Sequence, residues 1–230
     1  MDFSYLDRNV AEVRARIDKA CADAGRTDEV TMIAAVKSGE VDEINYLHRA
    51  LGVNDIGENR VQQLLDRYER LDKEGLRIHF IGHLQTNKVK YIIDKVHMIH
   101  SVDSERLAAE IDRQAKKHGI VMKVLVEINS GREENKDGVM PENAAALCAA
   151  VSQLPNLELC GVMTMAPVCE DPAEYRKYFD EIYALALDIW QKTLDNKERP
   201  IISMGMSGSF PEAIASGATA VRVGRRLFEK

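Results

Sequence analysis

The sequence predicts an α/β fold: a single-domain (β/α)8 TIM barrel with an extra helix at its N-terminus. Three observations predict it. Eight short apolar segments, rich in β-branched residues, alternate with helical patterns of apolar residues. The length of 230 residues is close to the roughly 250 usual for this barrel. No linker rich in glycine, proline or serine divides the chain, so residues 1–230 are expected to form one domain.

A doubly wound open sheet is the main alternative, because it uses the same alternation of strands and helices. The number of predicted strands favours the closed barrel.

Composition and charge argue against several classes of protein. The 31 lysines and arginines against 37 aspartates and glutamates give a net charge of −6, which argues against a nucleic-acid or membrane-surface binder. No apolar stretch approaches the roughly 20 residues that span a bilayer. The polar start lacks the layout of a signal peptide, and the four cysteines form no CxxC pair. We therefore expect a cytoplasmic protein with reduced thiols.

The first half of the chain supplies the extra helix and four strands. Apolar residues at helical spacing predict the extra helix over residues 3–24, and Gly25 is a suitable stop. Strands are predicted at residues 30–36, 53–56, 77–82 and 97–102. The helices that follow them are predicted at residues 40–50, 61–71, 86–93 and 107–115, with Gly119 closing the last.

The second half repeats the alternation. Strands are predicted at residues 121–128, 157–165, 200–204 and 219–223. Pro141 is expected in the first turn of one helix, Asp171 has the position of a cap before a long helix, and another helix starts at Pro211. Eight strands result, which is the number the barrel needs.

Lys37 stands at the end of the first strand, and two interpretations of it are open. An ammonium group at the edge of a core is costly unless it is paired, solvated or chemically used, and lysines in such places can form Schiff bases. A strand-end lysine can equally extend its charge into solvent. The strand alone favours the second interpretation.

Two glycine turns follow the seventh and eighth strands, at residues 205–208 and 224–226. In barrels, the loops after these strands often hold phosphate. Ser209 and Glu212 have the spacing of a capping box at a helix start, which suits an anion. Because barrel closure sets the eighth strand beside the first, an anion site here would neighbour Lys37. A phosphate anchor, a lysine and the inward Arg222 fit a phosphorylated aldehyde such as pyridoxal 5′-phosphate (PLP).

Six segments, in order over nearly the whole chain, resemble the YggS/PROSC family of pyridoxal phosphate homeostasis proteins. They are AVK at 35–37, GEN at 57–59, HFIGHLQTNK at 79–88, GVMTM at 161–165, SMGMS at 203–207 and VRVG at 221–224. The resemblance implies a barrel similar to the N-terminal domain of bacterial alanine racemase. It also implies covalent PLP binding without established turnover, and a role in cofactor and amino-acid homeostasis.

The resemblance also implies roles for nine residues. Lys37 would form the Schiff base, and Arg222 would face the pyridine nitrogen. The phosphate would lie against Ser207, Gly208, Gly224 and Arg225, and the ring would be lined by Asn59, His79 and Met163. Two positions depart from the family pattern: Ser209 replaces a frequent aspartate and Arg225 a frequent threonine, which puts the affinity in question more than the mode of binding.

Other interpretations of these residues stay open. Asn59 can be a helix cap, Met163 can be core filler, and His97 and His100 are read as structural. His79 and His83 lie four apart on a strand and its loop, not on one helical face, so we expect no metal site.

An arginine at position 222, facing the pyridine nitrogen, would limit the chemistry of bound PLP. An arginine stays protonated and donates to the ring nitrogen without handing over a proton. Carbanion chemistry would then be restrained, while exchange of the imine onto an amino acid would not. We therefore expect a monomeric carrier whose partners are PLP, amino acids by transimination and PLP-dependent apoenzymes, with no nucleic-acid or membrane partner.

Two enzymes are the alternatives. A PLP-dependent amino-acid racemase of the related barrel type completes its site with a second domain and a tyrosine base, for which this chain is expected to have no room. A lysine-imine aldolase acting on a phosphorylated sugar would carry no visible absorbance.

Overall fold

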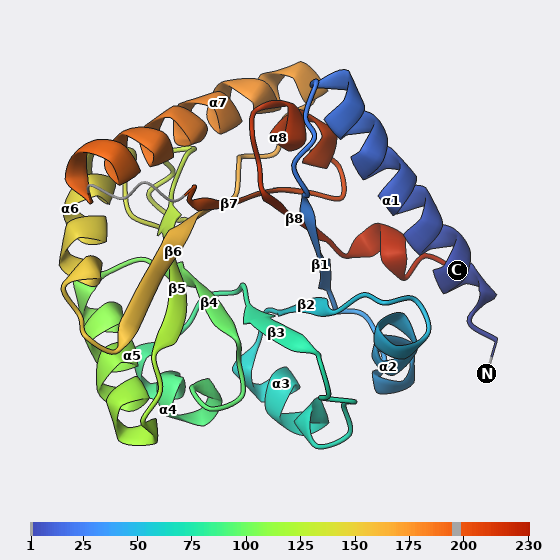
Figure 1. Ribbon diagram of the computed structural model, residues 1–230, viewed down its shortest axis with the longest axis horizontal. Helices are drawn as coiled ribbons and strands as arrows, with labels where there is room; N and C mark the ends of the chain where they lie inside the picture. The colour runs from blue at the N-terminus through green and yellow to red at the C-terminus, as the bar shows by residue number, and fades with distance from the viewer. Residues whose placement is uncertain (1, 195–198) are drawn as a thin grey trace.

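The strands of the computed structural model, which describes residues 2–194 and 199–230, close into a parallel barrel in the order β1 to β8 (Figure 1). Their bounds are β1 Thr31–Ala35, β2 Asp55–Glu58, β3 Arg77–Phe80, β4 Met98–Val102, β5 Met122–Ile128, β6 Leu157–Thr164, β7 Ile201–Met206 and β8 Ala220–Val223. Strand β8 pairs with β1, placing Val223 beside Ala34. The predicted barrel is confirmed, and the open sheet is excluded.

Helices form the outer layer around the strands (Figure 1). The α-helices are α1 Ser4–Asp23, α2 Val41–Arg49, α3 Val61–Tyr68, α4 Val89–Ile92, α5 Glu105–His118, α6 Pro141–Ser152, α7 Pro172–Asp188 and α8 Phe210–Ala215. Two 3-10 turns are η1 Thr86–Lys88 and η3 Arg225–Leu227, and the π-helical turn η2 Ile189–Thr193 follows directly on α7. The extra helix α1 packs against α8 and η3. In the described part of the chain, no helix is both long and apolar enough to cross a membrane.

Several predicted helix ends are confirmed. The Asp171 side chain accepts a hydrogen bond of 2.9 Å from the Ala173 N–H at the start of α7. Gly119 ends α5 in the left-handed conformation, with φ of 65°, which glycine adopts without a steric penalty. Pro141 is the first residue of α6, where a missing N–H costs nothing.

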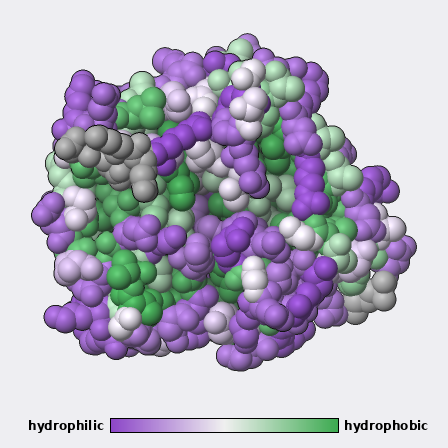
Figure 2. All heavy atoms as spheres, viewed as in Figure 1, coloured by the Kyte–Doolittle hydropathy of each residue, from purple (hydrophilic) through white to green (hydrophobic). Residues whose placement is uncertain are grey.

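The hydrophobic core lies mainly between the strands and the helices. Phe80, Phe179 and Phe210 are its largest fully buried side chains, and burying such a side chain contributes about 1.5–3 kcal/mol. A separate small cluster contains Met98, Leu125 and Met163. Hydrophilic residues dominate the face shown in Figure 2, and patches of hydrophobic residues interrupt them.

Strand ends differ from the prediction where the functional loops begin. Strand β1 ends at Ala35, two residues before Lys37, and β7 continues to Met206 instead of ending at residue 204. The pairing of β7 with β8 shifts register between Ser203 and Met206. Glycine fits this irregular position, because φ of Gly205 is 88° and a Cβ there would lie 2.5 Å from the Cβ of Ala213 in α8.

The predicted capping box of Ser209 and Glu212 is wrong. Ser209 makes no side-chain cap of α8. Its hydroxyl instead accepts a hydrogen bond of 3.2 Å from the Met206 N–H. The Ser209 side chain therefore stabilises the turn after β7 by bonding to Met206 within that turn.

Candidate functional site

A cavity of about 690 Å³ lies at the carboxyl ends of β1, β7 and β8, where active sites of this fold are found. Its wall includes seven of the nine residues singled out in the sequence: Lys37, Asn59, Ser207, Gly208, Arg222, Gly224 and Arg225. Apolar side chains of Ile81, Met165, Met206 and Phe228 complete much of the rest. The fold thus joins residues 37–59 to the last 24 residues of the chain in one wall.

Lys37 reaches this cavity from a turn that is fixed by α3. Lys37 is exposed, as the interpretation of a strand-end lysine in solvent expects, and β1 ends two residues before it, at Ala35. Gln63 donates a hydrogen bond of 2.8 Å to the Lys37 carbonyl oxygen. Arg67 Nη1 donates to the carbonyl oxygens of Val36 and Gly39, at 3.1 and 3.3 Å. These bonds hold the backbone, and the amine makes no hydrogen bond or ion pair with residues 2–194 or 199–230.

Beneath this turn, Arg67 forms a buried ion pair with Glu58. Its Nε lies 3.2 Å from Oε1 of Glu58, whose side chain is fully buried. Burial raises the pKa of Glu58 to about 7, against the opposing effect of the Arg67 charge. Sequence analysis missed this pair, although a glutamate inside an apolar strand end was a signal for it.

The two glycine turns are tied to each other. The Gly224 N–H donates a hydrogen bond of 3.2 Å to the hydroxyl of Ser207, so the loop after β8 is fixed to the loop after β7. A Cβ at Gly224 would lie 2.9 Å from the carbonyl oxygen of Ala35, whereas a Cβ at Gly208 would meet no atom within 4 Å. Gly224 therefore allows close packing against β1, and Gly208 keeps space open.

Asn59 lines the cavity and is not the helix cap, because Arg60 occupies the N-cap position of α3. Its backbone is held from the other side by Gly82, where a Cβ would lie 2.1 Å from the Asn59 carbonyl oxygen. Close contact between the loops after β2 and β3 thus places the amide in the wall.

Arg222 is buried, and its guanidinium is held from two sides. Nη1 donates to the carbonyl and hydroxyl oxygens of Ser203 at 2.8 and 2.7 Å, and Nη2 donates to the Thr164 carbonyl at 2.8 Å. Within residues 2–194 and 199–230, its Nε–H has no acceptor. Burial lowers the pKa of Arg222 to about 10, with the nearby Glu127 opposing that effect, so the group is a cation at neutral pH.

His79 and Met163 are not among the residues that line this cavity. Met163 is fully buried with Met98 and Leu125, which is the core position that sequence analysis left open. His79 is buried between Asp55 and His100, with a hydrogen bond of 2.9 Å to each.

Glu127 is a second buried carboxyl that sequence analysis missed. It is 3% exposed and faces a smaller cavity of about 220 Å³, which shares Met165 and Met206 with the larger one. Burial raises the pKa of Glu127 to about 8, Asp137 raises it further, and Arg222 acts against both. An acidic residue near the end of the apolar strand at 121–128 was the available signal.

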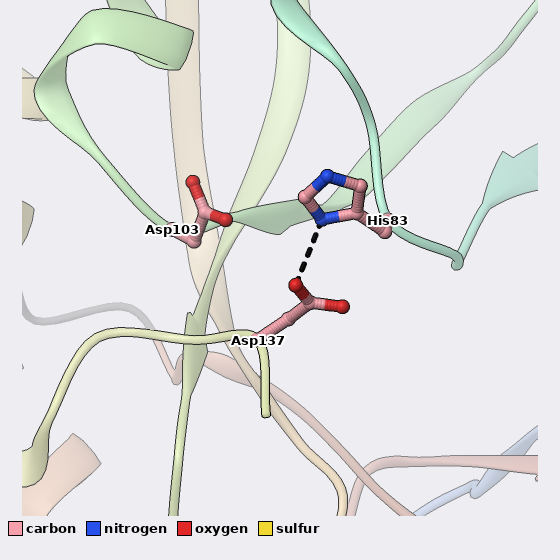
Figure 3. A group of neighbouring side chains, drawn as sticks. All are labelled: His83, Asp103 and Asp137. Carbon is pink, nitrogen blue, oxygen red and sulfur yellow. Dashed lines mark ion pairs between the residues drawn. The ribbon is translucent and has the colours of Figure 1, made fainter. Parts of the chain in front are cut away.

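His83, Asp103 and Asp137 meet at another part of the barrel mouth (Figure 3). They follow β3, β4 and β5, and His83 Nδ1 lies 2.9 Å from Oδ1 of Asp137. The two side chains of this pair are 52% and 44% exposed. The arrangement is a solvated ion pair with a second carboxylate nearby, and it lies outside the cavity that Lys37 lines.

Comparisons with known proteins identify relatives over the whole fold. The family described as alanine racemase, N-terminal domain, matches residues 2–229. A pyridoxal phosphate homeostasis protein of Aquifex aeolicus is 42% identical over 219 residues, 95% of each chain. A structure of an unknown protein from Bifidobacterium adolescentis aligns with a TM-score of 0.91 and 33% identity, covering 99% of this chain and 97% of that one.

A third relative was solved with a ligand. PipY of Synechococcus elongatus, in a structure with PLP bound, aligns with a TM-score of 0.84 and 30% identity, over 97% of this chain and 100% of that one. The match to the family, the level of identity and the coverage agree with one another. This chain therefore belongs to the alanine racemase N-terminal domain family and, within it, to the pyridoxal phosphate homeostasis proteins.

Proposed function

We propose that this protein binds PLP as a Schiff base on Lys37 and acts in intracellular PLP and amino-acid homeostasis without catalytic turnover. One observation carries the proposal: the Lys37 amine, the Arg222 guanidinium and two glycine turns line a single cavity. The PLP-bound structure of PipY, a relative of 30% identity, supports the same ligand.

The residues present fit the cofactor. Ser207, Gly208, Gly224 and the backbone of Arg225 would hold the phosphate, because the space above Gly208 is open and the two turns are already joined. The uncommitted Nε–H of Arg222 would donate to the pyridine nitrogen. The side chain of Asn59 would lie beside the ring, while His79 and Met163 would act only from beneath it.

Covalent attachment requires little of the protein. Lys37 would hold the cofactor by condensation of its amine with the aldehyde, in which the C=O bond is replaced by C=N and the oxygen is released as water. The exposed position of the side chain gives the reaction access to water and to incoming amines. Amino acids can then take the place of Lys37 by transimination, and apoenzymes can receive the released cofactor.

The cavity is better suited to holding PLP than to catalysis with it. When bound, PLP supplies an electron sink whose strength depends on protonation of its ring nitrogen. Arg222 remains charged at neutral pH and donates a hydrogen bond without losing its proton. Among the described residues that line the cavity there is no tyrosine or histidine to serve as the second base of a racemase. A monomeric, cytoplasmic carrier is the function proposed.

Absorbance and chemical trapping test the proposal. Purified protein incubated with PLP should show an imine band near the visible edge, and borohydride followed by peptide mapping should label Lys37. Lys37→Ala should lose both signals, whereas Lys19→Ala, which removes an exposed lysine of α1, should keep them. Labelling of a different lysine, or an unchanged band in Lys37→Ala, would overturn it.

A separate assay distinguishes the carrier from a racemase. The PLP-loaded protein should not interconvert L- and D-alanine, and enantiomer exchange that is lost in Lys37→Ala would establish the enzyme instead. A lysine-imine aldolase is excluded if the visible band appears with PLP and depends on Lys37.

A further inference from the structure

A continuous chain of polar side chains crosses the interior of the barrel. It runs from Asp55 on β2 through His79 on β3 and His100 on β4 to Ser203 on β7 and Arg222 on β8. All five residues are buried, with exposed fractions of 7% or less. Barrel interiors are usually filled by branched apolar residues. These five polar side chains therefore occupy positions where apolar packing is the rule.

The donors in this chain can be assigned from the Arg222 end. Arg222 Nη1 can only donate, so the Ser203 hydroxyl accepts from it at 2.7 Å. The hydroxyl hydrogen is then free to point at His100 Nδ1, which lies 3.2 Å away. A neutral His100 that accepts at Nδ1 carries its proton on Nε2.

The tautomer of His100 determines which ring nitrogen of His79 carries the proton. His100 Nε2–H donates across 2.9 Å to Nδ1 of His79, which leaves the His79 proton on Nε2. That proton points at Oδ1 of Asp55, also 2.9 Å away. Asp55 additionally accepts a hydrogen bond of 2.7 Å from Arg77 Nε, so the chain ends on a charge that is compensated.

From this geometry we infer that His79, His100 and Ser203 form a one-directional hydrogen-bond relay that positions Arg222 from the far end of the barrel. In every hydrogen bond of the relay the donor lies on the Arg222 side and the acceptor on the Asp55 side. Since Ser203 and Thr164 together take three of the guanidinium hydrogens, the Nε–H and one Nη2 hydrogen remain for the cavity. His79, His100 and Ser203 are positioning residues, because they act only through Arg222.

The charges around the relay support the neutral form of His100. Burial first of all lowers the pKa of His100 well below its ordinary value, and the nearby His79 and Arg222 lower it further. Burial would raise the pKa of Asp55, but hydrogen bonds from His79 and Arg77 prevail and lower it to about 2. An ionised Asp55 therefore faces a His79 ring that donates to it.

The inference deepens the proposed function and rests on it for one consequence. A guanidinium that is fixed by Ser203 presents a donor of constant direction to the pyridine nitrogen. Loosening it should weaken PLP binding without removing the Lys37 attachment. The relay itself makes no use of the cofactor and can be tested without it.

The first test uses the cofactor-free protein. Nitrogen-15 NMR of the histidine rings at neutral pH should show His79 and His100 as neutral rings, both protonated on Nε2. A proton on Nδ1 of His100, or a doubly protonated His79, would reverse the donors and overturn the relay. This measurement requires no substitution and therefore no assumption about the folding of a variant.

The second test compares two serines of the barrel. Ser203→Ala removes the hydroxyl that joins His100 to Arg222 and should weaken PLP binding about tenfold, the effect of losing one hydrogen bond to a charged group. Ser101→Ala is the matched control, because Ser101 is also buried on a strand and its hydroxyl has no hydrogen-bond partner within the described residues. It should bind PLP as the unsubstituted protein does.

The outcomes separate the relay from the proposed function. Equal PLP affinity in Ser203→Ala and in the unsubstituted protein would overturn the positioning role. Failure of the unsubstituted protein to bind PLP would instead refute the proposed function, and the ring tautomers would still decide whether the relay exists.

Discussion

The side-chain amide of Gln63 donates a hydrogen bond of 2.8 Å to the carbonyl oxygen of Lys37. One turn further along α3, Arg67 donates to the carbonyl groups on either side of that residue. Three contacts thus fix the backbone at the place where the Lys37 side chain projects from it.

Gln63→Ala should slow the borohydride-trapped labelling of Lys37 by PLP, by about three- to tenfold. The change removes one hydrogen bond, worth about 0.5–1.5 kcal/mol, from the turn that carries the amine. The control is Gln62→Ala on the same helix, where the side-chain amide donates a hydrogen bond of 2.7 Å to Asp66. Equal labelling rates in the two variants would show that the turn needs no support from α3.

Glu127→Gln should change how stability depends on pH. The pKa of Glu127 is about 8 in the folded protein, above its ordinary value of 4.5. Between these values the folded state retains a proton that the unfolded state has released, so stability falls as pH rises through this window, by up to about 1.4 kcal/mol per pH unit. Glutamine keeps the shape and removes the titration.

Urea unfolding at pH 5, 6.5 and 8 measures that effect. The unsubstituted protein should lose stability relative to Glu127→Gln as the pH increases. Glu58 titrates in the same direction, and it cancels because both proteins contain it. Parallel curves across the three pH values would contradict the raised pKa of Glu127.

Two glycine substitutions should separate folding from binding. Gly82→Ala places a methyl group against the Asn59 backbone and should destabilise the fold by about 1–3 kcal/mol. Gly208→Ala points a methyl group into open space at the cavity wall, so it should leave thermal stability unchanged and weaken PLP binding. Thermal unfolding and PLP titration of both variants check the contrast, which fails if Gly208→Ala melts early or binds normally.

His83→Ala should change little. An exposed ion pair such as that of His83 and Asp137 contributes about 0–1 kcal/mol, and it lies outside the cavity of Lys37. Thermal unfolding and PLP titration should both match the unsubstituted protein. A loss of PLP affinity above about threefold would show that this part of the barrel mouth contributes to the site.

Much of the fold was predictable because short sequence patterns determine its strands and helices. Alternating apolar strands and helices with suitable caps, such as Asp171 and Gly119, identify the barrel without any knowledge of contacts. Strand closure then predicts that Lys37 lies near Gly224, although these residues are far apart in the sequence. Such inferences depend only on topology.

The interior relay was not predicted, because it depends on which side of a strand each residue faces. His100 follows Met98 by two positions and so shares its inward face, but neither residue indicates a partner across the barrel. The hydroxyl of Ser203 is 103 residues away along the chain. The failed capping box has a similar origin, since Ser209 bonds within its own turn and not to α8.

Closure of β8 onto β1 has a consequence for the order in which the protein is made. On the ribosome, Lys37 emerges soon after β1, whereas Ser207, Gly208 and Gly224 emerge only once β7 and β8 have been synthesised. A nascent chain that has not yet docked its final strand therefore carries Lys37 without the two glycine turns that share its cavity. PLP binding at the proposed site would therefore report that synthesis has passed β8 and that the barrel has closed.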